Sequence, residues 1–518
     1  MQLRLAQKPG LIAACAAVLV LSSCNPFWGG RGPVAGRPIL DATYRASGHA
    51  AAGDVFVRLF EWSWPDVASE CETRLAPKGF KAVQVSPPQE DMGGTEWWTR
   101  YQPVSYSIAL SRSGTGAQFI DMVNRCKAVG VDIYVDAVIN HMTSNASGVG
   151  RNGTVYTKYN YPGLYTQSDF HASCLVDNYQ SAANVQDCEL GGLADLNTGL
   201  PAVRQKIADY LLGLARLGVA GFRIDSAKHI QPVELNDIIA RVNLTLAMEG
   251  RALPYYFGEV VDYSAEAVKP VDYFGLGYSS GGWADITEFK FRGVGYKFLG
   301  NGQYLAQLNP NGSAGNQFSE SAWGLMPADK AVVFLDNHDT QRSEGISFRN
   351  GATYRLANVF MLAQPYGYPS VMSSYFFDPA TGWGAGPPAT APGCAVSMES
   401  AAAGQWVCEH RDAAIANMIA FRRAVAGTAQ LNWWDNGANA IAFSRGDKGF
   451  VAINHESGSI TRTFATGLAA GNYCDVLAGG ANAGACIGQT IVVGADGSAG
   501  ITLPANTAVV LQKGIGIP

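Results

Sequence analysis

Short apolar runs rich in β-branched residues alternate along the chain with longer runs whose apolar residues recur at helical spacing. In the segment 201–218, Val203, Ile207, Leu211 and Leu214 form one such stripe, and a glycine follows it as a stop signal. Eight strands separated by helices favour a closed (β/α)8 barrel, a TIM barrel, over a doubly wound sheet. The eight predicted strands are 55–60, 82–86, 131–139, 221–225, 255–260, 285–289, 331–336 and 370–375.

Two regions depart from this alternation. Residues 140–197 are rich in Gly, Asn and Tyr and are far longer than an ordinary βα loop, so they predict a small lobe inserted after the third strand, over the mouth of the barrel. Residues 428–518 carry short alternating strands punctuated by Gly and Asn, which predicts a C-terminal all-β domain of the sandwich type. The barrel itself is then formed by 53–139 and 198–427.

The N-terminus has the features of an export signal. A basic start precedes the apolar run 11–24, which is too short to span a bilayer comfortably. The run ends in LSSC, which resembles a bacterial lipoprotein cleavage box and predicts lipidation of Cys24 and membrane attachment there. An ordinary secretory signal that contains a cysteine is the alternative. Residues 1–24 are therefore interpreted as the signal peptide and 25–52, rich in Gly, Pro and Ala, as a linker, and we expect an extracellular or cell-envelope protein.

Composition limits the function further. The net charge of -5 and the absence of a basic block argue against a nucleic-acid partner. Outside the signal, eight of the ten cysteines remain, an even number that fits an oxidising compartment. Cys71 and Cys126 each fall on the buried face of a predicted helix, which would allow them to pair. The simplest remaining pairs are Cys174 with Cys188, Cys394 with Cys408 and Cys474 with Cys486, although sequence alone does not fix this connectivity.

Polar residues gather where the predicted strands end. Arg223 and Asp225 lie on one face of the fourth strand, because side chains alternate between the two faces. A lone pair of this kind is usually a structural ion pair. Here three carboxylates, Asp225, Glu259 and Asp339, follow the fourth, fifth and seventh strands and would converge on one mouth. Glycoside hydrolysis requires one carboxylic acid and one carboxylate, so this set favours that chemistry.

Four short motifs, DAVINH, GFRIDSAKH, FGEV and FLDNHD, occur in this order and resemble the four sequence regions of glycoside hydrolase family thirteen. The segments LFEWSWPDVASECETRL and WWTRYQPVSY resemble the animal-type α-amylases of that family, which also occur in bacteria. The resemblance implies that Asp225 is the nucleophile, Glu259 the general acid/base and Asp339 a stabiliser of the transition state. It implies an exported, endo-acting, retaining hydrolase of α-1,4 bonds in starch, glycogen and maltooligosaccharides, expected as a monomer.

Two other functions stay open. A relative that transfers sugars or forms maltooligosaccharides would use the same intermediate, intercepted by a sugar instead of water. A glucan-binding lipoprotein without catalysis would not need the three carboxylates, and their presence argues against it.

The resemblance also implies a set of substrate-binding residues. His141 and His338 would donate hydrogen bonds to the central sugar, and aromatic side chains would stack on glucose rings. A cation beside Asp225 should favour its ionised form, and the apolar run before Glu259 should favour the protonated acid. The full implied set is Trp97, Trp98, Tyr101, Gln102, His141, Tyr179, Arg223, Lys228, His229 and His338.

Two ions enter by the same resemblance. Calcium would be held by the side chains of Asn140 and Asp195 and by the backbone carbonyls of Gln186 and His229, all oxygen donors that suit a hard cation. Animal relatives often bind chloride through two arginines and an asparagine. Arg223 and Asn337 match two of these positions, but Ser370 stands at the third. A neutral hydroxyl cannot supply the second cation, so we expect activity that does not depend on chloride.

Overall fold

A computed structural model of the protein describes residues 46–263, 266–274, 283–313, 316–343, 345–380, 382–389 and 392–517. The predicted signal peptide, Cys24 and most of the predicted linker lie outside these residues. The end of that linker is described, and it packs against the barrel. Ser47 Oγ donates to Asp285 Oδ2 at 2.7 Å, and the ring of His49, in α1 (His49–Ala52), stacks 4.3 Å from that of Tyr368.

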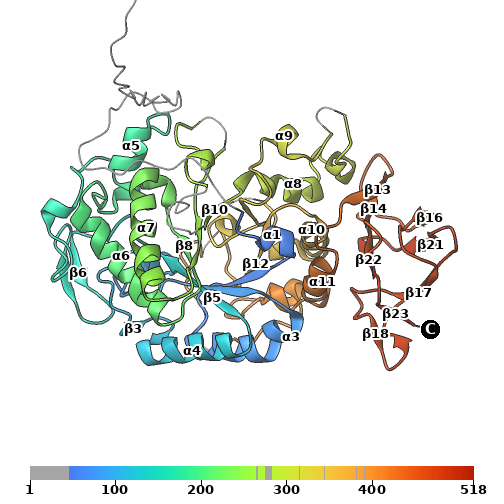
Figure 1. The fold of residues 1–518 in the computed structure, drawn as a ribbon, viewed down its shortest axis with the longest axis horizontal. Coiled ribbons are helices and arrows are strands. Elements are labelled where there is room, and N and C mark those ends of the chain that lie inside the picture. The colour runs from blue at the N-terminus through green and yellow to red at the C-terminus, as the bar shows by residue number, and fades with distance from the viewer. Residues whose placement is uncertain are drawn as a thin grey trace, which may run out of the picture. The chain divides into compact units, whose positions relative to one another are not determined.

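Eight parallel strands close into a barrel, which confirms the fold predicted from the sequence (Figure 1). The first strand pairs in parallel with both the second and the last, so no edge is left open. Each of the eight predicted runs contributes one strand. The barrel strands are β1 (Phe56–Leu59), β2 (Ala82–Val85), β5 (Asp132–Ala137), β8 (Gly221–Ile224), β9 (Tyr255–Gly258), β10 (Trp283–Thr287), β11 (Ala331–Val333) and β12 (Tyr368–Ser373).

Helices surround the barrel and cover its outer face (Figure 1). In α6 (Pro201–Arg216), the proline stands in the first turn, where its missing N–H and fixed φ suit a helix start, and the predicted apolar stripe is buried. The other helices of the barrel region are α2 (Trp64–Glu70), α3 (Ala76–Lys78), α4 (Gly116–Ala128), α7 (Pro232–Met248), α8 (Gly293–Leu299), α9 (Glu320–Trp323), α10 (Gly351–Ala363) and α11 (Ala413–Ala424).

The inside of the barrel changes character along its axis. At the amino-terminal ends of the strands the interior is a separate apolar cluster that includes Phe56, Tyr134, Tyr255, Phe257 and Tyr368. Two residues further along a strand the side chain points the same way again. On β1 that step leads from Phe56 to Arg58, and on β5 from Tyr134 to Asp136, so the carboxyl-terminal end of the interior is charged.

The inserted lobe lies between β5 and α6 in the chain. It contains the hairpin of β6 (Ser147–Val149) and β7 (Val155–Thr157) and the short helix α5 (Ala182–Asp187). Its hairpin turn is fixed to the loop after β2, because Glu90 accepts from the backbone amides of Asn152 and Thr154 at 2.9 and 3.2 Å. Besides its two chain connections, the lobe is therefore attached to the barrel through the hydrogen bonds of Glu90.

The C-terminal region is all-β. A four-stranded antiparallel sheet contains β13 (Gln430–Asp435), β14 (Ala440–Arg445), β15 (Gly449–Asn454) and β22 (Thr507–Gln512). One face of this sheet belongs to the main core, where the ring of Phe443 lies 6.1 Å from that of Phe360 on α10, and the other face packs into a second cluster. The remaining strands are β16 (Ile460–Ala465), β17 (Gly471–Cys474), β18 (Ala481–Asn482), β19 (Ala485–Cys486), β20 (Thr490–Val493), β21 (Ser498–Leu503) and β23 (Gly516–Ile517).

The described part of the chain contains four disulfides, and they join the pairs named from the sequence. The bond that joins Cys71, where α2 ends, to Cys126 of α4 links two neighbouring helices. The other three close short loops, at Cys174–Cys188, Cys394–Cys408 and Cys474–Cys486. Among the described residues, no helix combines the length and apolar character needed to cross a bilayer.

Candidate active site

One guanidinium group organises the carboxylates at the carboxyl-terminal ends of the strands. Arg223 Nη1 donates to Asp225 Oδ1 at 2.8 Å and to Asp136 Oδ1 at 2.5 Å, and its Nη2 lies 2.5 Å from Glu259 Oε1. Arg223 lies on β8 and Asp136 on β5, while Asp225 directly follows β8 and Glu259 directly follows β9. The structure therefore brings the predicted nucleophile and the predicted acid together on the two terminal nitrogens of a single arginine.

The ionisation of Asp225 differs from the expectation that Arg223 would hold it charged. Burial raises the pKa of Asp225 to about 8, and the negative charges of Glu259 and Asp136 act in the same direction. Arg223 lowers this pKa, as expected, but it is shared among three carboxylates. In the protein without substrate, desolvation therefore outweighs the nearby cation.

The third predicted carboxylate follows β11. His338 Nε2 lies 3.2 Å from Asp339 Oδ2, and 48% of the Asp339 side chain is exposed, while the histidine is buried. Desolvation by the surrounding walls and the charge of Glu259 raise the pKa of Asp339 to about 6. Burial also lowers the pKa of His338 well below its usual value, with Arg58 as the next cause. A neutral imidazole thus lies beside a carboxylate that is open to solvent.

Two residues that the predicted site set did not include, Arg58 and Asp136, form a buried polar network with the predicted Tyr101. Asp136 Oδ2 accepts from Arg58 Nη2 and from Tyr101 Oη, both at 2.8 Å, while the ring of Tyr101 stacks 5.1 Å from that of His338. Arg58 was missed although its strand is apolar at every other described position. A lone arginine inside such a strand is the signal that could have revealed it.

A second missed residue is Arg342, which holds the loop after β11 in place. It donates to the His338 carbonyl, to Tyr375 Oη at 2.9 Å and to the Trp383 carbonyl at 3.1 Å. Trp97 Nε1 donates to the same Trp383 carbonyl at 3.0 Å. Through the Trp383 carbonyl, Arg342 therefore connects the loop that contains His338 to the loop that contains Trp97. These segments are far apart in the sequence, so no local pattern reveals the link.

The predicted aromatic and amide residues of the loop after β2 take different positions. Trp97 is buried and Trp98 is half-buried, so the two neighbours do not both face inward. Gln102 is buried, and its Oε1 accepts from the Ser144 amide at 2.9 Å, which places it under the lobe. His141 Nε2 lies 3.0 Å from the Tyr101 carbonyl, and burial lowers the pKa of His141 to about 4.

Three further predicted residues gather where the lobe meets the segment after β8. Lys228 Nζ donates to the Val261 carbonyl at 2.7 Å and lies 4.7 Å from the ring centroid of Tyr179, whose side chain is exposed. His229 Nδ1 lies 2.7 Å from the Val185 carbonyl, and burial lowers the pKa of this histidine to about 4. Tyr179 and Lys228 thus form a polar and aromatic wall on the lobe side.

The predicted calcium ligands also meet at this junction. Asn140 Nδ2 lies 3.4 Å from Asp195 Oδ1, and the bond from His229 to Val185 brings the loop after β8 next to Gln186 on α5. Burial raises the pKa of Asp195 to about 7, and the hydrogen bond and charge of His171 oppose this shift without cancelling it. Side-chain and carbonyl oxygens around such a group fit calcium.

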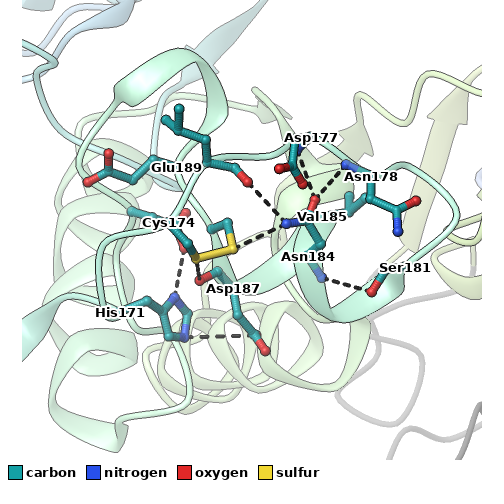
Figure 2. The surroundings of a disulfide bond; sticks show 12 residues. His171, Cys174, Asp177, Asn178, Ser181, Asn184, Val185, Asp187 and Glu189 are labelled. Atoms are coloured by element: carbon teal, nitrogen blue, oxygen red, sulfur yellow. Dashed lines mark hydrogen bonds and ion pairs between the residues drawn. A yellow bond between two sulfur atoms is a disulfide. The ribbon is translucent and has the colours of Figure 1, made fainter.

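The lobe around this junction is cross-linked and hydrogen-bonded (Figure 2). His171, which the prediction missed, places Nδ1 2.7 Å from Asp195 Oδ2, and Asn184 Oδ1 accepts from two backbone amides just after Cys174. The described residues contain no group of three or more His, Cys, Asp or Glu side chains arranged to hold a metal ion. The predicted site instead depends on an amide, one carboxylate and backbone carbonyls.

A closed barrel with three carboxylates around its arginine, an inserted lobe and an appended β domain defines a glycoside hydrolase of the (β/α)8 class. Residues 79–368 match the family described as alpha amylase, catalytic domain, and residues 431–514 match alpha amylase, C-terminal all-beta domain. The chain belongs to the α-amylase family, whose members hydrolyse α-glucans.

Individual relatives agree with this assignment. The chain is 45% identical to an α-amylase of Tribolium castaneum over 88% of its length and 93% of that protein, and 44% identical to one of Streptomyces violaceus over 89% and 74%. Among solved structures, a mutant of α-amylase I from Eisenia fetida in complex with maltohexaose superimposes with a TM-score of 0.79 at 37% identity, covering 91% of this chain and 98% of the other.

Proposed function

We propose that the protein is an exported, endo-acting α-amylase that cleaves α-1,4-glucosidic bonds with retention of anomeric configuration. The observation that carries this proposal is the contact of Asp225 and Glu259 with the two terminal nitrogens of Arg223. Carboxyl groups held by one guanidinium lie close together. In retaining enzymes the two carboxyl groups are about 5–5.5 Å apart, and one of them attacks the sugar directly. In inverting enzymes they are about 6.5–9.5 Å apart, which leaves room for the water molecule that attacks instead.

The proposed reaction has two displacements. An oxygen of Asp225 bonds to the anomeric carbon while the glycosidic bond breaks, and Glu259 gives its proton to the departing oxygen. Water then gives a proton to Glu259 and attacks the same carbon, which releases Asp225. Asp339, His338 and His141 are assigned to hydrogen bonds with the hydroxyls of the sugar ring.

The charges of the site fit this division of roles. Four carboxylates, on Asp136, Asp225, Glu259 and Asp339, are close to three guanidinium groups, on Arg58, Arg223 and Arg342. The one negative charge in excess favours a proton retained within the set at neutral pH, and such a proton belongs to the coupled group and not to one residue. The mechanism requires it on Glu259 when substrate is bound.

The test follows the anomer and the product length together. Proton NMR of early hydrolysis should show the α anomer first, and chromatography should show mid-length maltooligosaccharides from soluble starch before small sugars. The β anomer first would overturn the role of Asp225. Products longer than the supplied oligosaccharides would favour the transglycosylating alternative, and unchanged starch would favour the binding protein.

Calcium is proposed at Asn140, Asp195 and the carbonyls of Gln186 and His229. The buried carboxyl of Asp195, next to the side-chain amide group of Asn140, supports it. A bound cation would supply electrostatic attraction that clamps the lobe to the barrel, and it would take no part in bond cleavage.

Chloride independence is proposed on two contacts. Arg223 is already engaged by three carboxylates. Asn337 uses its side-chain oxygen within its own loop, where it accepts from the amides of Asp339 and Thr340 at 3.0 and 2.8 Å. With Ser370 on β12 in place of a second arginine, an added anion would meet mainly negative neighbours.

Export and the lipid at Cys24 are proposed from the N-terminal sequence, and the four disulfides fit an oxidising compartment. Mass spectrometry of the protein from membranes of a bacterial host should find a diacylated Cys24 as the first residue. A soluble mature protein that starts elsewhere, or an unmodified cysteine, would support the ordinary secretory signal instead.

A further inference from the structure

Ser226, the residue directly after the proposed nucleophile, has a left-handed backbone with φ 51° and ψ 31°. This region disfavours residues with a Cβ atom, and a non-glycine residue remains there only where its surroundings require it. The strained position lies between the end of β8 and the short 3-10 helix Ala227–His229. The strained backbone therefore lies directly beside the proposed nucleophile, Asp225.

Those contacts join the two proposed catalytic carboxyls. Ser226 Oγ donates to Asp225 Oδ2 at 3.1 Å, and the Ser226 backbone amide donates to Glu259 Oε2, also at 3.1 Å. Arg223 binds the other oxygen of each carboxyl. Each carboxyl is therefore held at one oxygen by the arginine and at the other by Ser226. The left-handed turn lets the amide and the hydroxyl of one residue reach both groups.

We propose that Ser226 is a positioning residue, whose amide holds Glu259 and whose hydroxyl holds Asp225 as the carboxylate that attacks the sugar. The inference rests on the proposed function, since it needs Asp225 and Glu259 in their assigned roles. It adds a second support for this pair besides Arg223, which the sequence motif placed next to Asp225 only.

A hydroxyl that donates to a carboxylate stabilises its charged form and lowers its pKa. The same molecule contains an isolated example, because the hydroxyl of Ser498 donates to Asp496 at 2.8 and 2.9 Å and is the main cause of a lowered Asp496 pKa. At Asp225 the Ser226 hydroxyl therefore lowers the pKa, as Arg223 does, and opposes the rise that burial causes. The charged and titratable groups that surround Asp225 are Arg223 on β8, Asp136 on β5, Glu259 after β9 and Tyr101 in the loop after β2. Arg58 on β1 binds Asp136, and Asp339 after β11 interacts with Glu259.

The main variant is Ser226→Ala, which removes the hydroxyl and keeps the backbone amide. Because Asp225 then loses a donor to its charged form, its protonation should occur at higher pH. The acidic limb of the pH profile of kcat/KM on an aryl maltotrioside should move up by about one pH unit. At pH values below the limb, kcat/KM should fall about tenfold, and at the optimum it should fall much less. A merely structural role would reduce activity or melting temperature without moving the limb.

A second variant, Ser226→Gly, separates strain from hydrogen bonding. Glycine accepts the left-handed backbone freely and retains the amide, so its melting temperature should be no lower than that of the alanine variant. Its acidic limb should show the same upward shift, because both variants lack the hydroxyl. This variant keeps the test available if the alanine variant fails to fold.

The matched control is Ser498→Ala, which removes a serine-to-aspartate bond of the same kind in the C-terminal domain and should leave the pH profile unchanged. An acidic limb that stays in place in both Ser226 variants, while Asp225→Asn is inactive, would overturn the inference and leave the proposed function standing. An active Asp225→Asn would instead overturn the proposed function.

Discussion

The two ends of the barrel interior are lined by the inward-facing side chains of the same strands but differ in chemistry. At the amino-terminal end, aromatic rings such as those of Tyr134, Tyr255 and Tyr368 fill the space between the strands. At the carboxyl-terminal end, two residues further on, the inward positions include Asp136 and Arg223, both almost fully buried. The first end contributes apolar burial to stability, whereas the second concentrates charges that are costly to desolvate.

The carboxyl-terminal end is therefore where the fold bears the free-energy cost of desolvating charges. The charged end satisfies its groups with one another, so Asp136 receives bonds from Arg58, Tyr101 and Arg223. Even so, burial raises the pKa of Asp225 to about 8. Substitutions at the charged carboxyl-terminal end should therefore change activity, and substitutions at the aromatic amino-terminal end should change stability.

The largest effect is expected for Asp225→Asn, which should lose about 10⁴-fold or more in kcat because the nucleophile is gone. Stability should not fall. Since the folded pKa of Asp225 lies above its unfolded value of about 4, ionisation costs the fold stability as pH rises from about 4 toward 8, and asparagine removes this cost. Thermal melting at pH 7 should show an unchanged or higher midpoint, and a clear drop would contradict the explanation.

Its matched control is Asp285→Asn, at the opposite end of the barrel. Asp285 is buried, lies 3.4 Å from Lys330 Nζ and accepts from Tyr255 Oη at 2.8 Å. Burial also raises the pKa of Asp285, but here the substitution takes the carboxylate partner from the fully buried ammonium of Lys330, so this variant should lower the melting temperature and keep kcat within about twofold. If it abolished activity in folded protein, the two ends would not be functionally separate.

Tyr255→Ala should have the largest effect on stability, about 3–5 kcal/mol, because it leaves a cavity among packed rings. Tyr255→Phe keeps the ring and loses only the bond to Asp285, so its cost should be about 1 kcal/mol. Denaturant melts measure both. The folded fraction of each should have the wild-type kcat, and a changed pH profile would show that the aromatic end also influences the site.

Removal of calcium should have an intermediate effect on the lobe side of the charged end. Exhaustive chelation should lower the melting temperature by several degrees, because a ligand that binds only the folded state stabilises it by linkage. Asp195→Asn, which weakens the proposed site, should melt lower and respond less to chelation. An unchanged melting curve in the parent protein would argue against the metal.

The smallest effect is expected from chloride. Titration of sodium chloride against nitrate and acetate at fixed ionic strength should change kcat by less than about 1.5-fold, because Arg223 alone faces three carboxylates. Ser370→Arg adds the missing cation, and this variant alone should gain anion dependence. Saturable activation of the parent protein by chloride would show that its charges already hold an anion.

Much of the site followed from local patterns. The spacing of Arg223 and Asp225 placed them on one face, and eight apolar runs indicated a barrel whose strand ends would bring Glu259 and Asp339 to the same mouth. Helical spacing also placed Cys71 and Cys126 on the buried faces of two predicted helices, where they could pair, and the bond is present. These inferences succeeded because strand and helix periodicity depends on short stretches of chain.

Tertiary structure alone decided the partners that come from distant segments. Arg58 on β1 and Arg223 on β8 both bind Asp136 on β5, and Arg342 reaches the carbonyl of Trp383 from another loop. The protonation of Asp225 was decided in the same way, because desolvation depends on everything packed around the group and not on its neighbour in the motif. The sequence by itself determined which residues point into the barrel, since that depends on local periodicity. Which charges they meet there, and how strongly, depends on closure of the whole barrel.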